Sequence, residues 1–261
     1  MQLNYFKKPA LLACLFTASM VGIHAQGKMY NVKDYGATGD GSTIDTDPIN
    51  KAITAAATAG GGTVYFPAGT YASFSIRLKS HISLYIDQGA TILAAANTTA
   101  PNAYDEPEPN EWGDKYKYQD FGHSHWHNSL IWGENLEDIS IMGPGTIYGK
   151  GLTREYRKLG DGNKAIGLKL CKNVTLKDFT ILLGGHFGML LSGIDNLTIN
   201  NIKEDTNRDG MDIDCCRNVH ISNCSVNSPW DDGICLKSSF ALGYLKATEN
   251  VTITTLPGKR F

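Results

Sequence analysis

The chain has 261 residues, of which 24 are basic and 26 are acidic, and its formal net charge is −2. A protein that tracks nucleic-acid phosphates normally carries a basic excess, so we expect no nucleic-acid partner. Apolar residues make up 42% of the chain and charged residues 19%, which excludes a disordered tail and a membrane bundle. The 28 glycines, 12 tyrosines and 9 phenylalanines favour all-β structure with many tight turns.

The first segment has the features of a secretory signal peptide. Lys7 and Lys8 precede an apolar run, residues 10–23, which is followed by the small residue Ala25. The run is too short to span a bilayer. We therefore expect residues 1–25 to be removed, and residues 26–261 to form a secreted or periplasmic domain with no membrane span. The five cysteines of that domain are expected to be mainly buried thiols, with room for one disulfide.

One helix is predicted near the start of the domain. Capping residue types at 45–47 precede Pro48, and apolar residues then recur at helical spacing until a run of three glycines, residues 60–62, ends the pattern. Short strands punctuated by turn residues follow, among them residues 63–66, 83–86 and 91–93.

A four-residue pattern then repeats along the chain. Asn, an apolar, a polar and an apolar residue begin at Asn173, Asn196, Asn218 and Asn250, with spacings of 23, 22 and 32 residues. Short strands repeating at about 22 residues are typical of a solenoid, and we predict a right-handed parallel β-helix with an N-terminal capping helix. The last spacing requires an inserted loop. Asn at each turn suits a left-handed backbone and ladders of side-chain hydrogen bonds.

The repeat brings carboxylates together. Asp209 and Asp232 are 23 residues apart, which is one lap of the coil, and successive laps lie ~4.8 Å apart. We therefore expect Asp209, Asp231 and Asp232 to converge on one side, while Asp212 and Asp214 share the face opposite the residue between them. Crowded carboxylates raise the pKa of one member, and split pKa values suit general acid and base hydrolysis. A calcium site or a solvated acidic turn is the alternative.

Two motifs resemble glycoside hydrolase family 28, the polygalacturonase and rhamnogalacturonase family. They are the Asn-x-Asp sequence at 207–209 and the Asp-Asp sequence at 231–232. The sequence from Tyr35 to Tyr71 is similar to the first, helix-capped lap of that family. The resemblance extends over roughly residues 29–250. It implies a right-handed parallel β-helix and inverting hydrolysis without a cofactor.

The resemblance also implies roles for residues. Asp231 matches the general acid, and Asp209 and Asp232 match the carboxylates that hold and deprotonate the attacking water, for which inverting enzymes need carboxyl groups about 6.5–9.5 Å apart. Asn207 would orient this group. Lys237 is a candidate for contact with a uronate carboxylate, the alternative being an ordinary surface lysine.

The sequence departs from the family pattern at several points. Arg208, a candidate for substrate binding, stands where Thr or Asn is common, and the downstream Gly-His-Gly and Arg-x-Lys motifs have no counterpart. His186 precedes the aspartates, so it does not match the motif histidine and is expected either to line the groove or to pack. The repeat breaks after residue 253, so we interpret the chain as truncated at its C-terminus and expect weak or no activity from it alone.

Two further features have competing interpretations. Trp230 precedes the aspartate pair and is expected either to face a sugar ring or to pack. The alternating histidines His123, His125 and His127 would share one face of a strand as metal ligands. No suitable carboxylate lies beside them in the sequence, so we favour a loop over the groove and predict no metal site.

The leading hypothesis is a secreted glycosidase that acts on acidic plant cell-wall polysaccharide, namely pectin, homogalacturonan or rhamnogalacturonan. A calcium-dependent, pectate lyase-like enzyme is the second hypothesis, because acidic clusters also suit calcium. A catalytically inactive carbohydrate-binding β-helix is the third.

Overall fold

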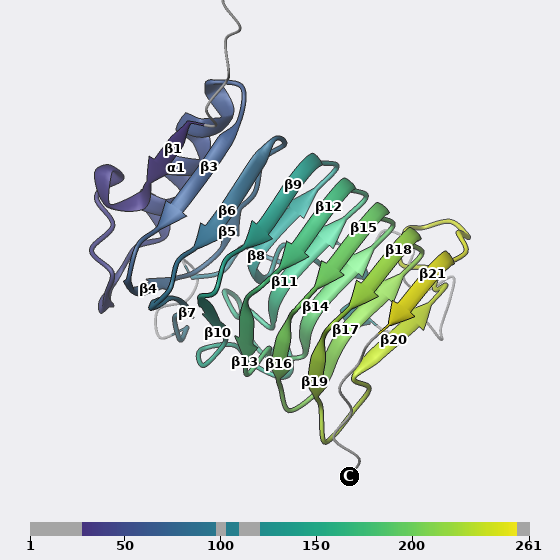
Figure 1. Cartoon of the computed structure of the whole chain (residues 1–261). Coiled ribbons are helices and arrows are strands. Elements are labelled where there is room, and N and C mark those ends of the chain that lie inside the picture. The colour runs from purple at the N-terminus through teal and green to yellow at the C-terminus, as the bar shows by residue number, and fades with distance from the viewer. Residues whose placement is uncertain (1–27, 98–102, 110–120, 255–261) are drawn as a thin grey trace, which may run out of the picture.

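The computed structural model describes residues 28–97, 103–109 and 121–254, and the chain in these ranges winds as a right-handed parallel β-helix (Figure 1). The predicted fold is confirmed. The predicted signal peptide lies outside the described residues. Within them, no helix has the length and apolar character needed to cross a bilayer.

Three parallel sheets form the walls of the coil, and consecutive strands along the chain belong to different sheets. The first sheet consists of β1 (Met29–Asn31), β3 (Gly62–Phe66), β6 (Ile82–Ile86), β9 (Glu137–Met142), β12 (Lys172–Lys177), β15 (Asp195–Asn200), β18 (Arg217–Ser222) and β21 (Glu249–Thr254). The second consists of β2 (Asp40–Ile44), β4 (Gly69–Ser73), β7 (Ala90–Ala94), β10 (Thr146–Tyr148), β13 (Thr180–Leu182), β16 (Lys203–Asp205) and β19 (Ser225–Asn227). The third, which carries the candidate site, consists of β5 (Ile76–Arg77), β8 (Ser129–Glu134), β11 (Lys164–Lys169), β14 (Phe187–Ser192), β17 (Asp209–Asp214) and β20 (Ile234–Lys237).

The strand register reproduces the period of the sequence. In the first sheet Lys172 pairs with Asp195, Asp195 with Arg217, and Arg217 with Glu249, which are steps of 23, 22 and 32 residues. The long step accommodates residues 238–248, an insertion between β20 and β21. This insertion packs back on the outside of the third sheet, where Ala241 joins a small apolar cluster with Trp126, Phe187 and Leu190.

Aliphatic side chains fill the interior of the coil because alternate residues of each strand point inward. Val174, Leu197 and Val219 stack in one such row of the first sheet and are at most 1% exposed. No single lap can bury its apolar residues alone, so each lap depends on its neighbours for a core.

Asparagines form the predicted ladder at the turn that enters the first sheet. The left-handed conformation is confirmed at Asn173, Asn196, Asn218 and Asn250, whose φ angles are between 54° and 64°. The side-chain amides of the last three donate to the Oδ1 of the preceding asparagine at 2.9, 3.0 and 3.2 Å, and that of Asn173 donates to Asp138 Oδ1 at 2.8 Å. The repeated asparagine therefore joins consecutive laps outside the core.

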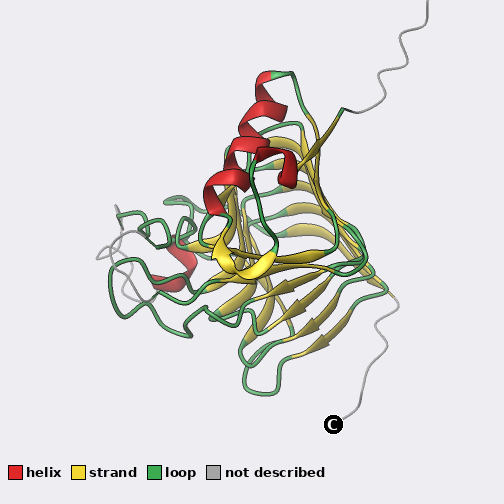
Figure 2. Cartoon of the chain, turned by 90° about the vertical axis from the view of Figure 1, so that its left-hand side faces the viewer, coloured by secondary structure: helices red, strands yellow, loops and turns green. Residues whose placement is uncertain are grey.

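Helix α1 (Thr46–Thr58) covers one end of the coil, which Figure 2 views end-on. The helix is confirmed where the sequence predicts it, and it buries Ile49, Ala52, Ile53 and Ala56 against the first laps. Its N-terminus differs from the prediction, because the Asp45 side chain makes no capping bond. Asp45 is instead buried and accepts hydrogen bonds from Thr38 and from the Gly39 amide, which fixes the loop before the helix.

The five cysteines within the described residues are free thiols, and none forms the disulfide that the sequence left open. Four of them are buried, and Cys235 is half-buried. This agrees with their expected use as small apolar side chains.

Candidate active site

The predicted convergence of three aspartates is found at the third sheet. Asp209 begins β17, and the turn before β20 carries Asp231 and Asp232. Two backbone bonds of 2.9 Å fix this turn beside β17, because the amides of Gly210 and Met211 donate to the carbonyls of residues 232 and 233. Side-chain oxygens of Asp209 and Asp232 lie within 4.8 Å of each other, and the side chains of Asp209 and Asp231 are hydrogen-bonded.

Asp209 holds a proton near neutral pH. The residue is only 4% exposed, and its pKa is raised to about 7. Burial is the largest cause, followed by the negative charge of Asp212 and by the hydrogen bond to Asp231. A protonated carboxyl donates such a bond, so Asp209 O–H donates to the Asp231 carboxylate.

The pKa of Asp231 is lowered, whereas that of Asp209 is raised. Arg208 Nε donates to Asp231 Oδ2 at 3.0 Å, and this bond is the largest cause that lowers the pKa of Asp231. The Asp232 amide adds a bond of 3.0 Å to Asp231 Oδ1. The two carboxyls therefore form a coupled pair that shares one proton, with split pKa values as the sequence analysis expects.

Arg208 belongs to a column of polar side chains on consecutive laps. Its Nη1 lies 2.6 Å from Nδ1 and 2.8 Å from Nε2 of His186, 22 residues earlier. His186 Nδ1 is also 2.5 Å from the Arg154 carbonyl oxygen, so the ring lies between the Arg154 backbone and the Arg208 guanidinium. The His186 ring also packs edge-on against Phe187. The His186 ring therefore packs on Phe187, while its nitrogens lie against the Arg208 guanidinium.

Lys237 lies on β20, the strand next to β17, and its ammonium contacts two side chains of the protein. Nζ is 3.1 Å from Asp212 Oδ2 and 3.1 Å from His123 Nε2. Burial is the largest influence and acts to lower the pKa of Lys237, but the charge of Asp212 and its neighbours outweighs it, so the pKa is raised overall. The Asp212 side chain is fully buried, so the lysine balances a buried charge.

Asp214 fixes the insertion between β20 and β21. The side chain is fully buried and accepts bonds from the amide and the hydroxyl of Ser239. Burial alone would raise the pKa of Asp214, but hydrogen bonds from His123 and Ser239 lower it. Asp212 and Asp214 share one face of β17 as predicted, and they support the site rather than line it.

Cys235 and His123 are neighbours of the aspartates that the sequence analysis did not assign to the site. Cys235 Sγ lies 2.5 Å from Asp212 Oδ1, and burial raises the pKa of this thiol. His123 approaches Asp212 and Asp214 from the short 3-10 helix η3 (Phe121–Ser124). The 23-residue step from Asp212 could have identified Cys235, whereas no local pattern places His123 there.

Two other candidates flank the aspartates. Trp230 is 75% exposed and so does not pack in a core, which leaves its ring accessible to a ligand. Asn207 is half-buried immediately before Arg208. The packing alternative for Trp230 is therefore wrong, while a contact of either residue with a substrate stays a prediction.

The carboxyl spacing is shorter than the sequence analysis expects. Inverting glycosidases hold the general acid about 6.5–9.5 Å from the base, whereas Asp231, the candidate acid, is hydrogen-bonded to Asp209. The hydrogen bond between Asp209 and Asp231 is the physical reason for their short separation. The Asp231 side chain is 35% exposed, so it has space to move outward.

Comparison with known proteins identifies relatives of this coil. A family model described as rhamnogalacturonase A/epimerase, pectate lyase-like, matches residues 29–125, and one described as right-handed beta helix region matches residues 127–251. A probable polygalacturonase of Vitis vinifera is 27% identical over 85% of this chain and 48% of its own length. A plasmin and fibronectin-binding protein A of Streptococcus pneumoniae is 36% identical over 66% of this chain and 23% of its own length.

The structure of a family 28 exopolygalacturonase of Yersinia enterocolitica is similar in fold, with a TM-score of 0.68 and 22% identity over 89% of this chain and 49% of that one. The chain thus spans less than half the length of the curated relatives named here. The match to the right-handed beta helix model agrees with the three parallel sheets of the structure. The chain therefore has the right-handed parallel β-helix fold, and its sequence is similar to pectate lyase-like families and to polygalacturonases.

Proposed function

We propose that this protein hydrolyses α-glycosidic bonds of a pectic polysaccharide, by inversion, outside the cytoplasm. The observation that carries the proposal is the coupled pair formed by Asp209 and Asp231, with Asp232 beside it. A proton donor and a carboxylate base within one cleft are what glycoside hydrolysis requires. The named polygalacturonase relative supports a pectic substrate.

The shared proton supplies the chemistry. For Asp231 to act as general acid, the proton passes along the hydrogen bond from Asp209 to Asp231 when the sugar enters the cleft. Asp231 then gives this proton to the leaving glycosidic oxygen. Asp209, now ionised, and Asp232 accept a proton from a water that attacks the anomeric carbon on the opposite face. The outward movement of Asp231 makes room for that water.

Defined α-1,4-linked galacturonic acid oligomers, with product anomers followed by NMR, test the proposal. A full-length version is expected to release a new reducing end that first appears in the β configuration, and the 261-residue chain to release it weakly or not at all. Asp231→Asn in the full-length version is expected to abolish turnover and to retain binding. An unsaturated product whose formation stops when a chelator is added would favour calcium-dependent elimination and would overturn the proposal. An α product would contradict inversion.

A binding protein without turnover is the second candidate. The similarity to the plasmin and fibronectin-binding protein favours it, as does the closed Asp209–Asp231 pair. If the full-length version retains pectic oligomers on a column yet releases no product, and Asp231→Asn does the same, this second function holds.

A further inference from the structure

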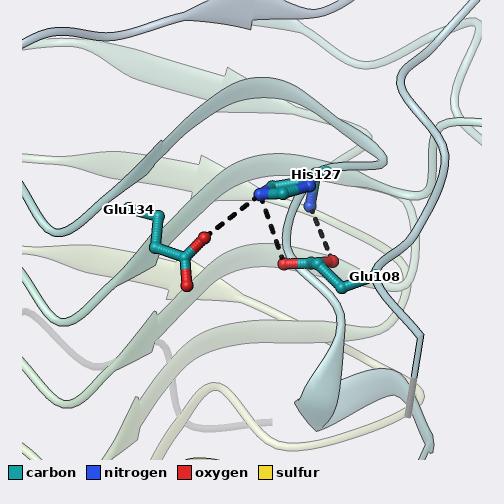
Figure 3. A group of neighbouring side chains, drawn as sticks. All are labelled: Glu108, His127 and Glu134. Atoms are coloured by element: carbon teal, nitrogen blue, oxygen red, sulfur yellow. Dashed lines mark hydrogen bonds and ion pairs between the residues drawn. The ribbon is translucent and has the colours of Figure 1, made fainter. Parts of the chain in front are cut away.

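A histidine and two glutamates from separate parts of the chain meet on the outside of the third sheet (Figure 3). Glu108 comes from the described segment 103–109, His127 precedes β8, and Glu134 ends β8. His127 Nε2 is 3.6 Å from Glu108 Oε1 and 3.3 Å from Glu134 Oε2. The three ligand atoms lie within 4.8 Å of one another.

The cluster is distinct from the aspartate cleft. The register connects Glu134 through Lys169 and Ser192 to Asp214, so all four residues belong to one row of the third sheet. Strands β11 and β14 lie between β8 and β17, and three strand spacings amount to about 14 Å. A ligand of this cluster therefore does not contact the aspartates directly.

In each glutamate, one carboxylate oxygen is held by hydrogen bonds or an ion pair, and the other lies near His127 Nε2. The amides of Trp126 and His127 donate to Glu108 Oε2 at 2.8 and 3.2 Å, while Lys169 Nζ is 3.0 Å from Glu134 Oε1. The remaining oxygens face His127 Nε2. Glu108 Oε1 is shielded from solvent and accepts no hydrogen bond from the described residues. A buried carboxylate oxygen whose only such contact among the described residues is the 3.6 Å approach of His127 Nε2 is suited to an electropositive partner.

The histidine is also held in place. Its ring stacks on Trp132 at 4.0 Å between centroids, with 35° between the planes. Outer contacts that fix the orientation of ligand side chains are typical of metal sites. A preorganised nitrogen with two carboxylate oxygens therefore converges on one point.

We propose that Glu108, His127 and Glu134 bind a divalent transition-metal ion of the zinc type. Tetrahedral ligands at about 2.0–2.2 Å from zinc lie about 3.3–3.6 Å from one another, which agrees with the separations from His127 Nε2. The imidazole nitrogen favours zinc over calcium, which takes oxygen ligands. Three protein ligands leave a fourth position for water or for a carboxylate of a bound molecule.

The alternating histidines indicated a metal site in the sequence, but only one of the three, His127, belongs to the cluster. The string of three histidines predicted a shared face, and the structure separates them. His123 faces Asp212 and Asp214, His125 is buried with its pKa lowered to about 4, mainly by burial, and only His127 reaches two glutamates. The relevant partners are distant in sequence, which is why the absence of neighbouring carboxylates argued against a metal site.

Isothermal titration of the full chain with zinc chloride tests the proposal. Wild type is expected to bind one zinc ion, and His127→Gln to weaken binding at least about 100-fold. Glu134→Gln is expected to do the same, which covers the case in which His127→Gln fails to fold. Calcium chloride is expected to bind much more weakly.

His81 provides a matched control. It also approaches two carboxylates, but Glu137 faces Nε2 at 3.8 Å and Asp138 faces Nδ1 at 3.3 Å, so they do not converge on one atom. His81→Gln should therefore bind zinc as wild type does, and so should Cys235→Ser, which alters the thiol beside Asp209 and Asp232. Absence of zinc binding in wild type, unchanged binding in His127→Gln, or loss in Cys235→Ser would overturn the proposal.

Discussion

Arg208 Nε donates a 3.0 Å hydrogen bond to Asp231 Oδ2 across one lap of the coil, and this bond keeps Asp231 ionised while Asp209 holds the proton. Arg208 and Asp231 are 23 residues apart, which equals the step between the paired residues Met211 and Ile234 in the third sheet. The arginine therefore helps to set the protonation of the pair.

Replacing this arginine should change the pH profile. Arg208→Gln removes the positive charge that lowers the pKa of Asp231, so the acid limb of kcat/KM should move up by about one pH unit or more. Arg217→Gln is the control, because Arg217 pairs with Asp195 at 3.1 Å on the first sheet, away from the cleft. Superimposable acid limbs for wild type and Arg208→Gln would contradict this account of Asp231.

Glu204 should make stability fall as the pH rises. Its carboxyl lies inside the coil, where a β-carbon at Gly188 would be 1.5 Å from Oε1, and it has no hydrogen-bond partner among the described residues. Burial raises its pKa from 4.5 to about 8. The stability that the protonated form contributes is fully present below pH 4.5 and is lost as the pH approaches 8, because the unfolded chain releases the proton first.

Thermal unfolding at several pH values checks this prediction. Glu204→Gln keeps a neutral side chain of similar size, so its advantage over wild type should grow from pH 4.5 to 8, up to a few kcal/mol at about 1.4 kcal/mol per tenfold change in proton affinity. A difference in Tm that does not vary with pH would show that Glu204 does not titrate in this range.

Lys237 should matter for stability as well as for the cleft. Lys237→Met leaves the fully buried Asp212 carboxylate without its cation, which should cost about 3 kcal/mol or more. Asp212→Asn in the same chain removes the stranded charge and should recover most of that loss. Chemical denaturation of both single variants and the double variant measures the coupling, and simple additivity would exclude the pair as a stabilising unit.

The asparagine ladder should show a conformational preference. Asn196 has a φ of 64° and bonds Asn173 on one side and Asn218 on the other. Asn196→Ala should destabilise by about 1–2 kcal/mol more than Asn196→Gly, because alanine resists the left-handed conformation that glycine accepts. Equal Tm values for the two variants would mean that the backbone conformation contributes nothing at this turn.

The period of the sequence was sufficient to predict the coil and to bring Asp209 beside Asp232, since register follows directly from the number of residues per lap. It was not sufficient for contacts that depend on side-chain direction. The Asp209–Asp231 bond arises in the turn before β20, and turn geometry is not encoded in strand spacing. His123 reaches Asp212 through a long connection that packs on the insertion, and such packing has no period to detect.

The most direct test of the central claim is a carboxyl carbon NMR titration of the aspartates, assigned with Asp209→Asn and Asp231→Asn. The account predicts that Asp209 titrates near pH 7 and that Asp231 titrates below the ordinary value of 3.8, with each curve altered when the other residue is replaced. Two independent titrations near pH 3.8 would mean that no shared proton exists, and the proposed hydrolytic centre would lose its donor.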